Sequence, residues 1–133
     1  MIYIFYLFCT CGQPTNESKT LPNDVTKREI ERDLTGVLSV INASCPIDID
    51  QSTITDSLTY DRIRNIIVYH NTILLELSVH DSSVKVFRSF STNQLPIDYE
   101  TGAGYAPFRE LGIGIEHRVR DIRGNDLFSV TVP

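Results

Sequence analysis

The residues of this chain that could act as nucleophiles or metal ligands are few and scattered. The cysteines comprise one Cys-x-Cys pair, Cys9 and Cys11, and the distant Cys45. A structural zinc site requires four ligands, usually arranged as two closely spaced pairs. The histidines do not complete such a set. They stand at His70, His80 and His117. The sequence therefore predicts no metal site.

Two of these residues can be judged as catalysts from their neighbours. Cys45 precedes Pro46 at the expected C-terminal end of a helix, where the helix dipole raises a thiol pKa. We therefore predict a packed thiol rather than a nucleophile. His117 follows Glu116 in an expected strand, so the two side chains point to opposite faces of the sheet. Because His117 shares its face with apolar residues, we predict a satisfied core or edge histidine rather than a general base.

Carboxylates and glycines offer no better match to a known kind of site. Asp48, Asp50 and Asp56 suggest calcium, but the calcium loop of EF-hands needs a Gly and a later Glu that are missing here. We predict a solvated turn. The stretch from Gly102 to Gly104 lacks the strand and helix that frame a nucleotide site. No catalytic, cofactor-binding or metal-binding residue is therefore assigned, and no cofactor is expected.

The balance of charge bears on the class of partner. The chain has 12 Lys and Arg against 17 Asp and Glu, a formal net charge of −5 over 133 residues. Binding duplex phosphates needs a concentrated basic face. The densest basic stretch, residues 117–123, is interrupted by Asp121. It predicts a solvated strand, and no nucleic-acid partner is expected.

The N-terminal residues predict a targeting segment rather than part of the fold. Residues 2–8 are apolar throughout, too few for a membrane-spanning helix of about 20 residues but within the ~7–15 residues of a signal-peptide core. The basic residues that precede such a core are missing. Our hypothesis is that the true start codon lies upstream, which an in-frame start followed by Lys or Arg would support.

An apolar run, a cysteine and a polar tether together resemble the N-terminus of a bacterial lipoprotein. The resemblance implies lipidation of Cys11, the better candidate, or of Cys9. Plain secretion and a cytosolic β-strand are the alternatives. The chain would then divide into a signal-like or anchor segment (1–11), a flexible tether (12–23) and one domain (24–133). The tether would reach on the order of 20 Å as a coil.

Hydrophobic periodicity predicts the elements of that domain. Thr26 with Glu29 forms a capping box. Residues 24–43 show an apolar stripe at helical spacing, made of Ile30, Leu34, Val37, Leu38 and Ile41. After Pro46 the period changes to two. The predicted strands are residues 52–60, 66–79, 113–120 and 127–132, the last two forming a C-terminal hairpin.

Between the predicted strands 66–79 and 113–120 the hydrophobic periodicity is weaker. Residues 81–83 could cap a short helix carrying Val84, Phe87 and Phe90, with a strand as the rival. Residues 91–104 predict a loop, because they contain Pro96 and two glycines, and residues 107–111 predict a short helix. In the strand at 52–60 we expect Ile54, Leu58 and Tyr60 on one face. The fold predicted is α+β: a two-layer sandwich of a mostly antiparallel four-stranded sheet and helices, in the order α-β-β-(α)-(α)-β-β.

Three segments of this pattern resemble a group of small uncharacterised bacterial exported proteins. They are the helix end at residues 40–50, with Asn42, Cys45 and Pro46; the Thr-rich strand at 53–60; and the Gly-led ending at 111–124. The resemblance implies the α+β fold and export, to the periplasm or to a tether on the outer membrane. It also implies a second cysteine near residues 90–93, which is absent here. Cys45 is therefore expected to be a buried free thiol, or to be joined to Cys9 or Cys11.

The function expected is that of a non-enzymatic binding module of the bacterial envelope, with an unknown protein or small ligand as partner. The predicted loop at residues 91–106 is long, and long loops concentrate binding residues. Tyr99 and Tyr105 are its candidate anchors. Two alternatives stay open: a hydrolase-like enzyme that pairs His117 with an acidic residue, and a structural or assembly subunit with an apolar patch on the free face of the sheet.

Overall fold

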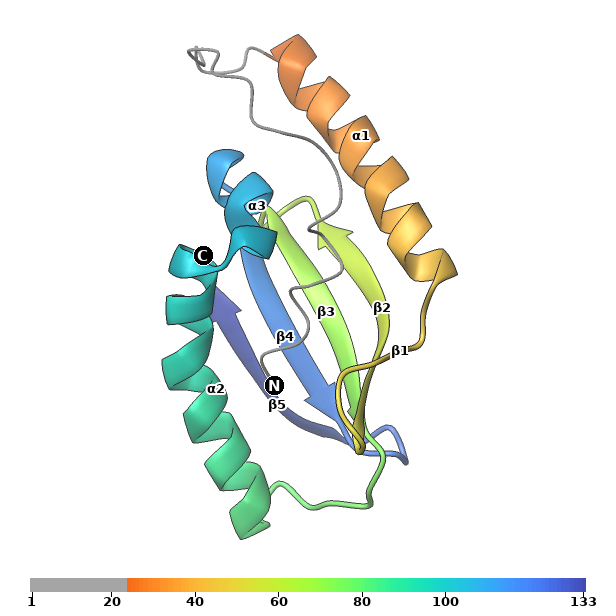
Figure 1. Cartoon of the computed structure of the whole chain (residues 1–133), viewed down its shortest axis with the longest axis vertical. Helices are drawn as coiled ribbons and strands as arrows, with labels where there is room; N and C mark the ends of the chain where they lie inside the picture. Colours follow the sequence, from red (N-terminus) through yellow and green to blue (C-terminus); the bar gives the residue numbers. More distant parts are fainter. Residues whose placement is uncertain (1–23) are drawn as a thin grey trace.

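The computed structural model describes residues 24–133, so the predicted anchor segment, the tether, Cys9 and Cys11 lie outside the described residues. The described part folds into helices packed on one face of a sheet (Figure 1). The elements in chain order are α1 (Asp24–Ala43), β1 (Ile47–Asp48), β2 (Thr53–Asp61), β3 (Ile66–Ile73), α2 (Ser82–Thr101), the 3-10 helix η2 (Ala103–Tyr105), α3 (Ala106–Glu110), β4 (Gly114–Arg120) and β5 (Asp126–Val132).

The sheet has five strands in the order β1-β2-β3-β4-β5. All neighbours are antiparallel except β3 and β4, which are parallel. Two parallel strands need a long crossover, and α2, η2 and α3 supply it. The α+β class and the N-terminal helix on the sheet are confirmed. The predicted four-stranded sheet is corrected to a mixed five-stranded one, because the two-residue β1 adds an edge strand that is too short to show a periodicity.

Helix α1 packs on the sheet through Leu34 and Leu38, which belong to the main core. It begins at Asp24, so Thr26 lies inside the helix and not at its N-cap; the predicted capping box is wrong in its position. Its last turn is fixed to β2 by Asn42. The side-chain amide of Asn42 donates to the carbonyl of Leu58 at 2.8 Å and accepts from the Leu58 N–H at 2.7 Å.

Strand β2 changes face halfway along its length. Its register with β3 shifts between Thr55 and Ser57, which is a β-bulge at Asp56. Thr55 before the bulge and Leu58 after it are both buried, whereas Ile54 pairs with Thr72. The predicted common face for Ile54 and Leu58 is therefore wrong, because one extra residue reverses the alternation.

Two further boundaries differ from those predicted. Strand β3 ends at Ile73 and not at residue 79, and the chain then runs as a loop whose Leu75 carbonyl accepts from the Ile122 N–H at 3.2 Å. Helix α2 continues to Thr101, so the predicted loop at residues 91–104 is wrong. Pro96 removes one backbone donor, but buried Leu95 and Tyr99 on either side anchor the helix to the core.

The last part of the chain follows its prediction closely. Helix α3 is followed by Gly112, whose φ of 66° is the left-handed conformation that ends a helix most easily at glycine. Strands β4 and β5 form the predicted C-terminal hairpin. Its turn is organised by Asp121, which is 1% exposed and whose carboxylate accepts from the N–H groups of Arg123 and Asn125 at 3.0 and 2.8 Å.

Candidate functional site

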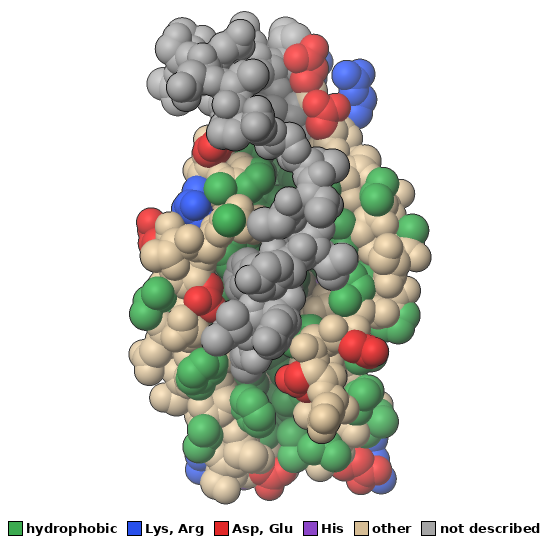
Figure 2. All heavy atoms as spheres, viewed as in Figure 1, with side chains coloured by type: hydrophobic (Ala, Val, Ile, Leu, Met, Phe, Trp, Pro, Cys, Tyr) green, Lys and Arg blue, Asp and Glu red, His purple; other side chains and the backbone are tan. Residues whose placement is uncertain are grey.

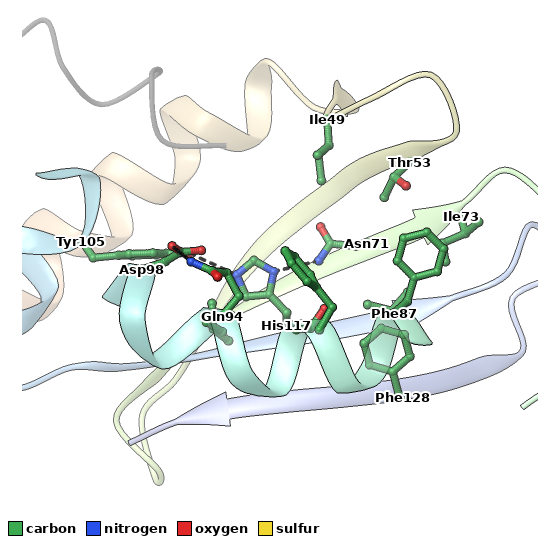
Figure 3. A pocket seen from close by; sticks show the side chains of 14 residues that line it. Ile49, Thr53, Asn71, Ile73, Phe87, Gln94, Asp98, Tyr105, His117 and Phe128 are labelled. Atoms are coloured by element: carbon green, nitrogen blue, oxygen red, sulfur yellow. Dashed lines mark hydrogen bonds between the residues drawn. The ribbon is translucent and has the colours of Figure 1, made fainter. Parts of the chain in front are cut away.

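A cleft opens on the helix-covered side of the sheet, between α2, the β1–β2 turn and strands β3 to β5. Its volume is about 80 Å³. Figure 3 shows that α2 supplies one wall and Ile49 and Thr53 face it from the other side. Aromatic and aliphatic side chains fill one end, and polar ones gather at the other. The apolar lining includes Ile49, Ile73, Phe87, Phe90, Val119 and Phe128. The polar lining includes Asn71, Gln94, Asp98, Tyr105 and His117.

The polar end is a continuous hydrogen-bond network. Thr55 donates its hydroxyl to the Asn71 carbonyl oxygen at 2.8 Å. The Asn71 amide nitrogen lies 3.2 Å from His117 Nδ1, and the Tyr105 hydroxyl lies 3.3 Å from His117 Nε2. We assign Nδ1 as the acceptor, because the amide nitrogen of Asn71 can only donate. The ring of Tyr69 stacks on the imidazole with centroids 4.6 Å apart.

His117 is neutral in this network. Burial of the ring lowers the pKa of His117 to about 4, since the charged form would lose its hydration. The nearest carboxylate of the cleft, Asp98, accepts instead from Gln94 at 2.8 Å. Both ring nitrogens of His117 therefore have uncharged partners, which confirms a satisfied histidine, and the residue is half-buried.

The two predicted tyrosine anchors are placed differently from the sequence expectation. The segment that carries them is helix α2 and η2 rather than an open loop, and Tyr99 and Tyr105 are only 6% and 1% exposed. The Tyr99 hydroxyl donates to the Ile113 carbonyl at 2.7 Å, which makes it part of the core. Tyr105 lies in the wall of the cleft. The role of Tyr99 and Tyr105 as binding residues stays a prediction.

Most of the residues that line the first cleft were not predicted from the sequence, although their spacing carried a signal. Phe87, Ser91, Gln94 and Asp98 recur at helical spacing along α2 and all face the cleft. That spacing would have predicted one helix face if Pro96 had been accepted within the helix. Phe87 and Phe90 are 41% and 47% exposed, which is unusual for large aromatic side chains beside a cavity.

A second cleft, of about 310 Å³, lies between α1 and α3. It is lined by Leu34 and Val37 on one side and by Phe108 and Leu111 on the other. Gly104 lines this second cleft and its neighbour Tyr105 lines the first, so this short buried segment lies between the two clefts. We refer to the two clefts together as the groove. Val37 was predicted on the core stripe of α1, but it is 47% exposed because it borders the groove.

The opposite face of the sheet carries charged side chains in pairs. Glu116 is buried there, 2.5 Å from an Arg64 nitrogen and also bonded to Arg118. Burial alone would raise the pKa of Glu116, but the hydrogen bonds from Arg118 and Arg64 outweigh it and lower the pKa. Arg120 pairs with Asp56 at 3.4 Å. The basic stretch is thus a solvated strand with local partners, as predicted.

The remaining candidates form no site of their own. Within residues 24–133, no three His, Cys, Asp or Glu side chains come together as metal ligands. Asp50 accepts from Ser52 in its turn, and Asp56 faces the other side of the sheet. Cys45 is half-buried and its Sγ lies 4.0 Å from Asn42 Oδ1. Burial and the nearby Asp56 raise the pKa of the Cys45 thiol, so it is a poor nucleophile.

The described part also contains nothing that spans a bilayer. Within residues 24–133, none of the helices combines the length and the apolar character needed to cross a membrane.

Comparison with known proteins identifies the fold. No protein-family model matches the sequence, and no curated protein matches it. Among solved structures, the chain is similar to a Pseudomonas aeruginosa protein assigned as secreted, with a TM-score of 0.62 and 14% identity over 84% of this chain and 95% of that one. It is also similar to the pilotin EpsS of the Vibrio vulnificus type 2 secretion system, with a TM-score of 0.59 and 16% identity over 83% of this chain and 93% of that one. The predicted resemblance to small bacterial exported α+β proteins is confirmed at the level of the fold.

Proposed function

We propose that this protein is an exported interaction module of the bacterial envelope that binds an apolar segment of another envelope protein in the groove. The observation that carries the proposal is the pair Phe87 and Phe90. These aromatic rings border a cleft and stay 41% and 47% exposed, although the same helix buries Val84, Leu95 and Tyr99. Exposed aromatic residues around a concave apolar surface are typical of protein-binding sites.

The size and shape of the groove favour a protein segment over a small molecule. A cavity of about 150 Å³ holds a benzene-sized ligand, so the first cleft, at about 80 Å³, accommodates roughly one aliphatic side chain. The second cleft, between α1 and α3, lies on the other side of Gly104 and Tyr105. An extended or helical segment could place one side chain in each cleft, which is how grooves commonly recognise peptides.

The comparisons support the cellular setting of this proposal. Both similar structures belong to exported or envelope proteins, a secreted protein and a pilotin of a secretion system. A pilotin-like fold is in keeping with a role in assembling an envelope machine. The predicted signal-like segment, with Cys11 or Cys9 as the lipidation site and residues 12–23 as tether, would hold the domain at a membrane.

The geometry gives less support to the two alternatives. A hydrolase built on His117 needs a carboxylate hydrogen-bonded to the imidazole, and Asn71 and Tyr105 take both ring nitrogens instead. A structural subunit that associates through an apolar free sheet face needs an apolar surface there. That face carries ion pairs such as those of Glu116 and Arg120.

The test is site-specific photo-crosslinking in the cells that produce the protein. A photoreactive amino acid replaces Phe90 in the groove or, as a control of similar exposure, Ile122 in the β4–β5 turn. We expect an adduct with an envelope protein from position 90 and none from position 122. Adding Phe87→Arg should remove the adduct without unfolding the domain, as monitored by circular dichroism. Equal adducts from both positions, or none from position 90, would refute the proposal.

A further inference from the structure

Strand β5 forms one edge of the sheet, away from the groove. Within residues 24–133 its strand partner is β4, and Figure 1 shows β5 as the outermost strand on its side. Residues 128–132 pair with β4 in an unbroken register and contain neither a charged residue nor proline. Alternate residues of an edge strand point their N–H and C=O groups away from the sheet, where another strand can pair with them.

The opposite edge of the sheet is protected against such pairing. Strand β1 has only two residues, and the Leu58 backbone beyond it is bonded to the Asn42 amide. Lysine, proline and very short strands are common ways to protect an edge. Between Phe128 and Val132, β5 uses none of these three. Its backbone is therefore suited to an extended segment that adds a strand to the sheet.

Helix α2 lies over β5 on the inner, helix-covered side of the sheet, as the space-filling view of this side in Figure 2 and the ribbon in Figure 1 allow the reader to follow. Val84 of α2 shares one apolar cluster with Leu127, and Leu95 shares another with Val130. One flank of α2 faces the first cleft, with Ile49 of the β1–β2 turn on the other side. The opposite flank of α2 therefore faces outward, over the β5 edge.

The outward flank of α2 carries two cations. Lys85, Arg88 and Thr92 recur at helical spacing on the side of α2 away from Gln94, which lines the cleft. All three are exposed, although Arg88 lies one turn after the buried Val84. Such exposure is expected where the helix extends past the last strand. Among residues 24–133, neither Lys85 nor Arg88 forms an ion pair, so both charges are open to a partner.

We infer that the β5 edge binds an extended segment of a partner protein that carries Asp or Glu where it passes Lys85 and Arg88. The backbone of the segment continues the sheet beside β5, and its carboxylates pair with the two cations of α2. Main-chain hydrogen bonds supply the affinity in this mode of binding, and the charges guide association and reject basic segments. This site is separate from the groove and goes beyond the proposed function.

A second copy of this chain fits the same edge less well. Neighbouring strands lie about 4.8 Å apart, whereas packed helices need roughly 8–10 Å between their axes. Two β5 strands side by side would bring the α2 helices that lie over them too close together, with Lys85 and Arg88 of both copies at the contact. An extended segment without such a helix meets neither obstacle.

The test uses synthetic peptides of one length with alternating Val and Thr, which differ only at two positions that are Glu, Gln or Lys. Their dissociation constants from the full chain are measured by fluorescence anisotropy. Two further forms of the Glu peptide carry N-methyl groups on its odd or on its even residues, which removes the N–H donors from one edge of the peptide strand or from the other. The charge variant is Lys85→Gln with Arg88→Gln. The matched control, Arg28→Gln with Arg32→Gln, removes the same charge from exposed positions of α1.

We expect the Glu peptide to bind most tightly and only one of its two N-methyl forms to bind. The charge variant should weaken binding of the Glu peptide by about threefold to tenfold, as expected for two exposed ion pairs. The matched control and Phe90→Ala, in the groove, should leave it unchanged.

Three results would overturn the inference. They are the absence of binding by every peptide, equal binding of both N-methyl forms, and equal affinities of the Glu, Gln and Lys peptides. Sedimentation of the chain alone tests the remaining occupant: a dimer that the Glu peptide dissociates would assign the edge to a second copy and overturn the inference as well. The crosslinking test of the groove is independent of all these outcomes.

Discussion

The two faces of the sheet both carry charged side chains, but they use them differently. On the outer face, which the helices do not cover, Glu116 is held by Arg64 and Arg118, and Arg120 pairs with Asp56. On the inner, helix-covered face, the carboxylate that lines the first cleft is that of Asp98, which accepts from Gln94 and has no cationic partner within residues 24–133. A face whose charges are satisfied internally stabilises the domain, whereas a face that leaves the aromatic rings of Phe87 and Phe90 exposed beside an apolar cleft is suited to a partner. Substitutions on the two faces should therefore separate stability from binding.

The largest effect on stability is expected where the groove meets the core. Asn71 is 3% exposed and bonds both Thr55 and His117. Asn71→Leu keeps the approximate volume but leaves two buried polar groups unsatisfied, so we expect a loss of about 2–4 kcal/mol in the free energy of unfolding. Urea denaturation measures it. A change below about 0.5 kcal/mol would show that the network at the groove floor is not structural.

His117 should give the inner face a pH dependence of its own. Its pKa is lowered from 6.5 to about 4 in the folded state, so the folded protein binds fewer protons than the unfolded chain in this range. The contribution of neutral His117 to the free energy of unfolding is therefore complete above pH 6.5 and is lost as the pH falls toward 4. Because the ring lines an open cleft, we expect a loss of about 1–2 kcal/mol rather than the full value of the shift.

His117→Gln is the variant that checks this contribution. The difference in unfolding free energy between pH 7 and pH 4 should be smaller in the variant than in the natural chain. An identical pH profile for the two proteins would mean that His117 titrates normally and is not held neutral.

Glu116 should give the outer face a pH dependence at lower pH. Its folded pKa is lowered from 4.5 by Arg118 and Arg64, so its contribution is present above pH 4.5 and is lost as the pH falls through the folded pKa. Glu116→Gln should cost about 1–2 kcal/mol near pH 7, since the freed arginines can regain water. The cost, from denaturation at a series of pH values, should shrink below pH 4.5. Crosslinking from the groove should be unaffected.

The smallest effect on stability is expected at the groove rim. Phe90 is 47% exposed, so Phe90→Ala should change the free energy of unfolding by less than about 1 kcal/mol. Its effect on crosslinking in the groove should be much larger. A stability loss as great as that of Asn71→Leu would contradict the assignment of Phe90 to a binding surface.

The sequence predicted elements whose information is local. Helix α1 and the β4–β5 hairpin follow their periodicity, because each buries a regular face. Helix α2 was predicted only as far as Phe90, since Pro96 and a run of polar residues hid its continuing face. The bulge at Asp56 and the parallel pairing of β3 with β4 depend on contacts between distant residues. No local pattern reports such contacts.

The candidate site depends even more on contacts between distant residues, which local sequence patterns do not report. Its lining comes from the β1–β2 turn, β3, α2, η2 and the last two strands, so no segment contains its pattern. His117 was correctly predicted as a satisfied core or edge histidine from its apolar strand neighbours. That Tyr105 and Asn71 are its partners followed only from the tertiary structure.

The Asn42 amide has a consequence for how this molecule meets other proteins. By donating to and accepting from the backbone of Leu58, it occupies the hydrogen-bonding groups of β2 just beyond the short strand β1. A foreign strand that approached this border would have to displace the end of α1 before it could form a ladder. The sheet is thus protected from pairing with a further strand at this border.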